Sequence, residues 1–407
     1  MTTPLDELAR RFAGWGAPGD AVVVRTLDTL GALVTGAGTA EGGAIGRFAG
    51  WDDGVLGDVV RRVAMTRMTE LDDIHMRTCT TPGAVVVPTA VTVGAALNAG
   101  PAAYARAVEI GYEAMIRLGG AIGGALAVYR GVWPTYFCAP FAAAAVVASL
   151  LELGPEATRN ALGIALTRAT GLTSGITGTP LARWLTLGDA ARAGCSAAFA
   201  ARDGFIADAD LERVAASAGV GFDRAAALDE CDPAIGAVSV KPFPTAKQSL
   251  AATEAALRLR ALVAVDEISL VRVHVPDAYA HMVANPPSAA SRLSRMSSAR
   301  WNVALALTRP NELHDVERAV PLDDPEPARV AALVEVVADP EMARLYPNRW
   351  PARVVIGDVE EVVVNASGDP PANGREAVEA KWRERRQPLD AFSASSPYEL
   401  DDALRAR

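Results

Sequence analysis

The stretch GAVVVPTAVTVGAAL, residues 83–97, is apolar on nearly every side of the helix that it would form. Such a helix has no face for water and belongs at the centre of a bundle. A second stretch, PFAAAAVVASLL (residues 140–151), has the same character. Alanine and glycine are abundant and aromatic residues are only 6% of the chain, which favours closely packed helices over a β-sandwich. We therefore expect a helical bundle built around these two segments.

The segments around this centre have the spacing of amphipathic helices. DELARRFAGW, DAVVVRTLDTLGALV, GVLGDVVRRVAM and AAYARAVEIGYEAMIRL each repeat apolar residues every three or four positions. Glycine and proline separate them, as in TGAGTAEGG and ELGPEA. The chain up to about residue 230 is thus predicted to be helical throughout.

The pattern changes after residue 240, where strands are predicted between helices. The expected elements are a helix over 245–262, a β-branched strand over 267–275, a helix over 298–307, two strands around Gly357-Asp358 within 353–366, and a charged helix over 373–386. The predicted fold is mainly α, with a large all-helical domain (1–240), a smaller α/β domain (241–368) and a C-terminal segment (369–407) that returns to the helical domain.

Composition and charge exclude several functions. The chain has 407 residues, 50% of them hydrophobic and 21% charged, which is typical of a globular protein with a large core. A net charge of −9 argues against a nucleic-acid or anionic membrane surface. The longest apolar run, residues 137–154, is interrupted by Pro140 and Glu152, and the N-terminus lacks the apolar run of a secretory signal. Four widely spaced cysteines fit reduced thiols, so we expect a cytoplasmic protein.

Candidate general bases gather in TELDDIHMRTCTTPG, residues 69–83: Glu70, Asp72, Asp73 and His75. Neighbouring carboxylates raise each other's pKa, which turns an acid into a base that is useful near pH 7. The same residues allow two other interpretations. Asp-Asp-x-His offers metal ligands, although no spacing elsewhere suggests a fourth. Thr80 or Thr81 before Pro82-Gly83 is also typical of a helix cap.

Two basic sites are also candidates. Only three lysines occur in the chain, and Lys241 and Lys247 both fall in KPFPTAK, which hints at a role that arginine cannot fill. Arg183, in GTPLARWLTLGDAARAG, either clamps a carboxylate or pairs with Asp189. The sequence has no G-x-S-x-G, G-x-G-x-x-G or Walker pattern, so no cofactor and no metal are expected.

In chain order, several stretches resemble the MmgE/PrpD family, which includes 2-methylcitrate dehydratases, cis-aconitate decarboxylases and iminodisuccinate epimerases. They are RTLDTLGALVTGAG, LDDIHMRTCTTPGAVVVP, GVWPTYFCAPFAAAAVVASLLEL, LTLGDAARAG, KPFP, YPNRWPARVVI and GDPPANGREAVEAKW. The resemblance implies a helical domain with an α/β lid, a homodimer, and a cofactor-free site between domain and lid. It also implies removal of a proton next to a carboxylate, followed by dehydration, decarboxylation or epimerisation.

The resemblance assigns roles residue by residue. Lys241 matches the family's active-site lysine, and Asp72, Asp73 and His75 match its D-D-x-H element. Glu70 stands where many members have an aspartate.

Elsewhere the sequence departs from the family. Thr81 replaces the histidine before Pro-Gly, and Trp133 replaces the histidine of H-P-T, whose threonine is Thr135. Arg183 replaces a lysine, and Arg300 or Trp301 falls near the family's tyrosine. Neither threonine nor tryptophan titrates near neutrality, whereas Arg183 and Arg300 still offer cationic donors. We therefore expect a substrate with fewer carboxylates and more hydrocarbon than citrate-like acids.

The expected activity is that of a lyase that dehydrates a hydroxy-carboxylate, with a place in specialised metabolism. The base would be His75 or an acid of residues 70–73, with Lys241 stabilising the enolate-like intermediate. An epimerase or isomerase, a decarboxylase, and a non-catalytic protein that binds a small acid are the alternatives. The only expected partners are a small carboxylic acid and a second copy of the chain.

Overall fold

The structure is a computed structural model that describes residues 3–48, 54–171, 180–229, 234–288 and 291–384. Its contacts divide the chain into two compact units between Val238 and Ser239, close to the expected boundary at residue 240. Residues 369–384, which we expected to return to the helical domain, belong by their contacts to the second unit. Asp369 binds the ammonium of Lys247 there, which ties the start of this segment to the second unit. Residues 385–407 lie outside the described residues.

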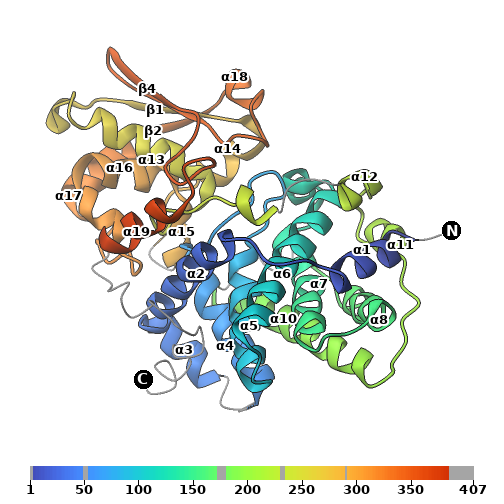
Figure 1. Ribbon diagram of the computed structural model, residues 1–407. Coiled ribbons are helices and arrows are strands. Elements are labelled where there is room, and N and C mark those ends of the chain that lie inside the picture. Colours follow the sequence, from blue (N-terminus) through green and yellow to red (C-terminus); the bar gives the residue numbers. More distant parts are fainter. Residues whose placement is uncertain (1–2, 49–53, 172–179, 230–233, 289–290, 385–407) are drawn as a thin grey trace. The chain divides into compact units, whose positions relative to one another are not determined.

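The first unit is built from helices (Figure 1). They are α1 (Pro4–Ala13), α2 (Ala21–Ala37), α3 (Ala40–Phe48), α4 (Val55–Arg67), α5 (Pro82–Ala96), α6 (Pro101–Ala121), η2 (Gly124–Arg130), α7 (Pro134–Leu150), α8 (Pro155–Leu166), α10 (Pro180–Arg202), α11 (Leu211–Ser217), α12 (Arg224–Leu228) and η3 (Ala234–Ala237). Proline stands first in many of them because its missing N–H would have no partner at that position and its φ is already helical.

The two apolar stretches form the central helices α5 and α7, as predicted. All but the last two residues of α5, and all but Ser149 in α7, are buried. Helix α7 packs against α5, α6, α8 and α10. Small side chains allow this close approach, since a Cβ on Gly194 of α10 would lie only 2.1 Å from the carbonyl oxygen of Pro140 in α7.

Helices α2 and α3 meet at a sharp bend. Within the described ranges no single helix is both long and apolar enough to cross a bilayer. Taken together, α2 and α3 have the length and the apolar composition for a crossing, but the pair is bent by 87° at the junction.

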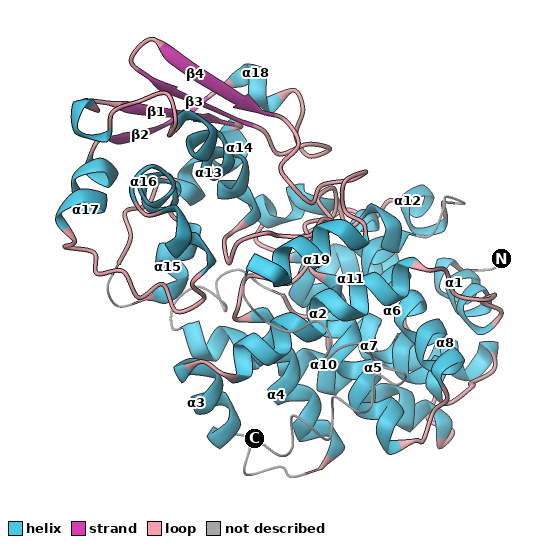
Figure 2. Ribbon diagram, turned by 60° about the vertical axis from the view of Figure 1, so that its left-hand side comes forward, coloured by secondary structure: helices cyan, strands magenta, loops and turns pink. Residues whose placement is uncertain are grey.

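The second unit contains a small sheet and the helices that cover it (Figure 2). Its elements are α13 (Lys247–Leu259), η4 (Val265–Glu267), β1 (Val271–Val275), α14 (Asp277–Val283), α15 (Arg292–Ser297), α16 (Ala299–Thr308), η5 (Pro310–His314), α17 (Pro325–Ala332), β2 (Val334–Ala338), α18 (Pro340–Ala343), β3 (Ala352–Ile356), β4 (Val359–Val363) and α19 (Arg375–Glu384). This confirms the expected fold class of a mainly α protein with a smaller α/β part.

The sheet has the strand order β2-β1-β3-β4. Strands β1 and β2 are parallel, while β3 pairs antiparallel with both β1 and β4. Val271, Val273 and Val275 alternate with more exposed residues, so one face of β1 enters the core with α13 and α16. The predicted strand over 267–275 and the hairpin at Gly357-Asp358 are confirmed, with strand β1 shorter than expected. Strand β2 was not predicted.

Replacing Gly194 by alanine should destabilise the first unit. The new methyl group would overlap the backbone of α7 at Pro140, and relief requires a shift of one helix against the other. We expect the free energy of unfolding, measured by urea denaturation, to fall by roughly 1–3 kcal/mol. Gly16→Ala is the control because nothing lies within 4 Å of a Cβ there. Equal midpoints for the two variants would contradict the close approach of α7 and α10.

Candidate active site

The segment between α4 and α5 is a buried loop rich in polar side chains. From Met68 to Gly83 only Arg77 is exposed. The backbone N–H of His75 donates to the carbonyl of Thr80 at 2.8 Å, which closes the loop on itself. Two loop residues, Glu70 and Cys79, have positive φ of 53° and 51°. Because buried polar groups need partners, the contacts of this loop show which side chains hold the fold and which remain for a ligand.

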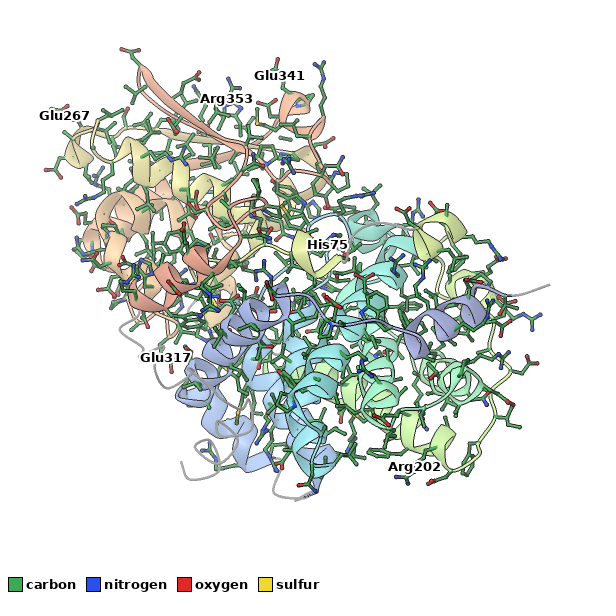
Figure 3. The ribbon with its side chains drawn as sticks, viewed as in Figure 1. His75, Arg202, Glu267, Glu317, Glu341 and Arg353 are labelled. Carbon is green, nitrogen blue, oxygen red and sulfur yellow. The ribbon has the colours of Figure 1, made fainter. Side chains whose placement is uncertain are left out.

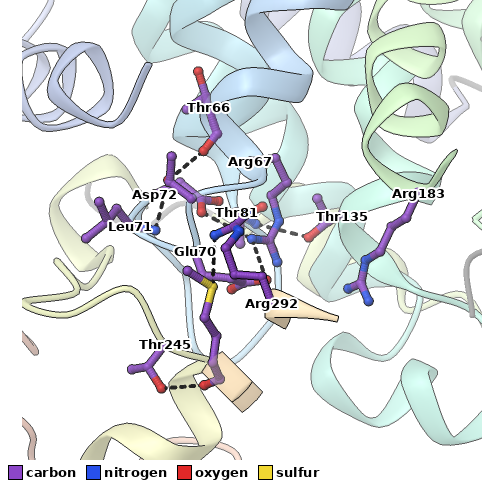
Figure 4. A network of polar contacts seen from close by, with 12 residues as sticks. Thr66, Arg67, Glu70, Leu71, Asp72, Thr81, Thr135, Arg183, Thr245 and Arg292 are labelled. Carbon is purple, nitrogen blue, oxygen red and sulfur yellow. Dashed lines mark hydrogen bonds and ion pairs between the residues drawn. The ribbon is translucent and has the colours of Figure 1, made fainter. Parts of the chain in front are cut away.

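Two of the candidate carboxylates bind an arginine. The guanidinium of Arg67, at the end of α4, lies 2.9 Å from Glu70 and 3.2 Å from Asp72 (Figure 4). Burial opposes its charge, yet the carboxylates of Asp72 and Glu70 raise the pKa of Arg67 above its ordinary value. The same guanidinium lies over the ring of Trp184 at 5.5 Å. Glu70 and Asp72 therefore serve first as counter-charges to a buried cation.

Asp73 joins the loop to two helices. One carboxylate oxygen accepts the backbone N–H of Gly83 at 2.8 Å, and the other accepts the hydroxyl of Tyr112 at 2.6 Å. Burial raises the pKa of Asp73 to about 6, although both hydrogen bonds act in the opposite direction. A Cβ on Gly83 would lie 2.8 Å from Asp73 Oδ1 and 2.5 Å from Thr29 Oγ1, so only glycine fits. Asp73, one of the predicted bases, thus anchors the loop to the start of α5 and to α6.

His75 is held as a neutral imidazole. Its Nδ1 lies 2.8 Å from the hydroxyl of Thr78, which in turn lies 2.7 Å from the hydroxyl of Thr80. Burial, and to a smaller extent the charge of Arg77, lowers the pKa of His75 to about 4. His75 is buried, whereas Arg202, labelled at the edge of the same unit in Figure 3, is exposed. At neutral pH such an imidazole is unprotonated and only weakly basic, and its protonated form gives up its proton readily.

Thr81 stands at the N-cap position of α5, but its hydroxyl does not cap the helix. The backbone of Thr81 has φ −113° and ψ 76° and donates its N–H to Thr135 Oγ1 at 3.2 Å. The hydroxyl of Thr80 contacts that of Thr78 instead. The prediction that the side chain of Thr80 or Thr81 caps α5 is therefore wrong. Among the residues that the structure describes, Thr81 Oγ1 is buried without a hydrogen-bond partner, so it can bind a ligand.

Arg183 is held by aromatic rings. Its guanidinium carbon lies 4.8 Å from the ring centre of Trp133 and 5.2 Å from that of Trp184, and its Nε donates to the Tyr136 hydroxyl at 3.2 Å. Asp189, the alternative partner, binds Arg192 at 2.8 Å. Within the described part of the chain Arg183 has no carboxylate partner. Its charge is thus available for an anionic ligand.

In the second unit the two lysines of KPFPTAK are both buried. Lys247 Nζ lies 2.5 Å from Asp369 Oδ1. Burial lowers the pKa of Lys247, and the charge of Lys241 acts in the same direction. Arg300, the other candidate cation, donates from Nε to the carbonyl of Ala284 at the end of α14, 3.0 Å away.

Arg67, Tyr112, Tyr136 and Trp184 were not predicted as part of this site. Arg67 gave one signal, because it precedes Glu70 by three residues. No local sequence signal points to Tyr112, because it lies 39 residues from Asp73 and only the fold brings α6 to the loop. In the described residues no three histidine, cysteine, aspartate or glutamate side chains lie close enough together to hold a metal ion.

Asp73 and His75 should contribute opposite pH dependences to stability. The pKa of Asp73 is raised from 3.8 to about 6, so its contribution is full below pH 4 and is lost as the pH rises towards 6. The pKa of His75 is lowered from 6.5 to about 4, so its contribution grows as the pH rises from 4 to 6.5. Each change is on the order of 2–3 kcal/mol.

Urea denaturation between pH 4 and 7 measures both contributions. Relative to wild type, Asp73→Asn should make stability rise more steeply with pH, and His75→Gln should make it rise less steeply or fall. Profiles parallel to that of wild type would show that these groups titrate alike in the folded and unfolded chain.

Comparison with protein-family models gives two matches. The MmgE/PrpD N-terminal domain matches residues 62–223, and the MmgE/PrpD C-terminal domain matches residues 243–389. No curated protein sequence matches the chain. The two matches confirm the resemblance drawn from the motifs, and the family's dehydratases and related lyases support an enzyme in general terms. The chain belongs to the MmgE/PrpD family.

Proposed function

We propose that the protein is a cofactor-independent lyase that removes a proton next to a carboxylate and dehydrates a hydroxy-carboxylate. The observation that carries this proposal is Arg183, a stacked guanidinium without a carboxylate partner in the described residues. A fixed guanidinium binds a carboxylate in bidentate fashion and holds it in one orientation. Binding of that carboxylate would also stabilise the negative charge that spreads onto it as the neighbouring proton leaves.

His75 is the proposed base. Glu70 and Asp72 already bind Arg67, and both oxygens of Asp73 are occupied, whereas the imidazole is neutral and held by Thr78. In the proposed reaction, His75 takes the proton from the carbon next to the carboxylate, and the electron pair moves into an enolate-like system. The bond from the next carbon to its hydroxyl then breaks, the electron pair stays on oxygen, and a proton completes the departing water.

The low pKa of His75 suits the second half of this reaction. A protonated imidazole with a pKa of about 4 readily returns its proton, so the same residue could protonate the leaving hydroxyl. The partner-free hydroxyl of Thr81 is the proposed hydrogen-bonding group for the substrate's own oxygen. Lys241 is proposed to stabilise the enolate-like intermediate through its ammonium group.

The proposed substrate carries one carboxylate near the reacting carbon and a hydrocarbon portion. Trp133, Tyr136 and Trp184 surround Arg183 and favour an apolar neighbour. Threonine and tryptophan occupy the positions of two family histidines, so fewer groups remain to bind further carboxylates.

Epimerisation is the second candidate. A site without the two family histidines can remove a proton from one face of the carbon and, once the planar intermediate has turned, return a proton to the opposite face, which inverts the carbon and expels no group. Both reactions share the first step and differ in the fate of the intermediate.

Solvent deuterium distinguishes these reactions. Purified protein is incubated in D₂O with hydroxy, unsaturated and amino carboxylic acids, and the products are analysed by mass spectrometry beside Lys241→Ala. Dehydration predicts loss of water from a hydroxy acid, and label in the acid formed when an unsaturated acid is hydrated in reverse. Label without any other change in mass indicates epimerisation, and loss of carbon dioxide indicates decarboxylation. Ligand-induced stabilisation without label or turnover across the panel would contradict catalysis and favour a binding protein.

Arg183→Gln should weaken the reaction of whichever acid is turned over. Loss of one charge-assisted contact costs about 1.5–3 kcal/mol, so kcat/KM should fall by roughly 10- to 150-fold. Arg192→Gln is the matched control, because this arginine lies in the same helix and binds Asp189 at the surface. Equal kcat/KM in both variants would show that Arg183 does not bind the substrate.

A further inference from the structure

The segment that carries Lys241 is tied at both ends to one loop, residues 366–369. Before the lysine, the backbone N–H of Val240 donates to the carbonyl of Gly368 at 2.9 Å. After it, the ammonium of Lys247 lies 2.5 Å from Asp369 Oδ1. Because Gly368 and Asp369 are neighbours, these two contacts close residues 240–247 into a ring.

The loop that closes this ring is itself fixed. Both oxygens of Glu254, in α13, accept the backbone N–H of Ser367, at 2.8 and 3.0 Å. The second oxygen of Asp369 accepts the backbone N–H of Ala366 at 3.0 Å. Gly368 has a φ of +81°, and a Cβ there would lie 2.3 Å from the carbonyl oxygen of Val240. The loop thus requires glycine at the point where it meets the residue before Lys241.

A buried arginine holds the middle of the ring. Arg318 Nη2 donates to the carbonyl of Pro244 at 2.8 Å and to Asn302 Oδ1 at 3.0 Å. Thr245 Oγ1 donates to the carbonyl of Met296 at 2.8 Å (Figure 4). The backbone on the C-terminal side of Lys241 is therefore held from the interior of the unit.

We propose that Lys247, Asp369 and Arg318 are positioning residues for Lys241. This inference rests on the proposed function, which gives Lys241 its role at the intermediate. Two lysines so close in sequence are both buried, and Asp369 balances the ammonium of Lys247 and fixes it to the loop. The ion pair thereby holds the backbone that carries Lys241 in place.

The chain's three lysines allow a direct test. Lysine labelled with ¹³C at Cε gives one ¹³C frequency per residue, which is assigned by substituting each lysine in turn. A fixed lysine shows two inequivalent Hε protons, whereas a mobile one shows a single averaged signal. In wild type we expect inequivalent Hε protons for Lys241. In the double variant Lys247→Met/Asp369→Asn they should merge. The unit should stay folded because both charges of the pair are removed together and Glu254 keeps its hydrogen bonds to the backbone N–H of Ser367.

The matched control is Arg258→Gln/Glu361→Gln, which removes an exposed ion pair from the same helix α13. It should leave the Lys241 signal unchanged. Inequivalent Hε protons of Lys241 in a folded Lys247→Met/Asp369→Asn variant would overturn the proposal. If that variant does not fold, Thr245→Val tests the same ring, with Thr253→Val, which removes a buried hydroxyl bond within α13, as its control.

Activity is measured separately, so the two proposals can fail independently. Absence of turnover by wild-type protein on every acid would count against the proposed function, while the Lys241 signal still decides whether the ring positions this residue. Where an acid is turned over, the double variant should lower kcat by at least tenfold with KM nearly unchanged.

Discussion

The two hydrogen bonds of Asp73 determine the shape of the site loop. They join the loop to the first turn of α5 through Gly83 and to α6 through Tyr112, so one carboxylate connects three segments. The residues on either side depend on this connection: Glu70 and Asp72 meet Arg67 on one side, and His75 meets Thr78 on the other. Burying the Asp73 carboxylate costs free energy, as its raised pKa shows. The fit around Gly83 is so close that a Cβ at this position would overlap Asp73 and Thr29.

Most of the fold could be predicted because its signals are local. All-round apolarity identified α5 and α7, and Gly357-Asp358 marked the hairpin of β3 and β4. Strand β2 was missed because VEVVA follows α17 almost directly and buries only Val334 fully, so it shows no clear alternation. Its place depends on pairing with β1, a contact between distant parts of the chain.

The sequence placed the acids and His75 in one segment, but it could not predict which groups they would contact. Sequence spacing placed acids and a histidine together, yet only the fold shows that the acids bind Arg67, Gly83 and Tyr112. The fold likewise shows that Arg183 does not pair with Asp189, which was one of its two predicted roles. Asp189 has Arg192 three residues further along α10 and binds it, which leaves Arg183 to the aromatic rings.

This division of partners separates the charged groups that are compensated within the fold from Arg183, on which the proposed function depends. A buried charge is tolerated where an opposite charge or several hydrogen bonds accompany it, and Arg67 and Lys247 meet that condition within their own units. Arg183 is only partly buried, and aromatic rings and one hydroxyl hold its guanidinium. In the proposed reaction, a bound carboxylate would give Arg183 a charge partner, and the binding energy would orient the acid for proton removal. The departures from the family that the sequence predicts at Thr81, Trp133 and Arg183 agree with the proposed site, which relies on one fixed cation and one neutral imidazole.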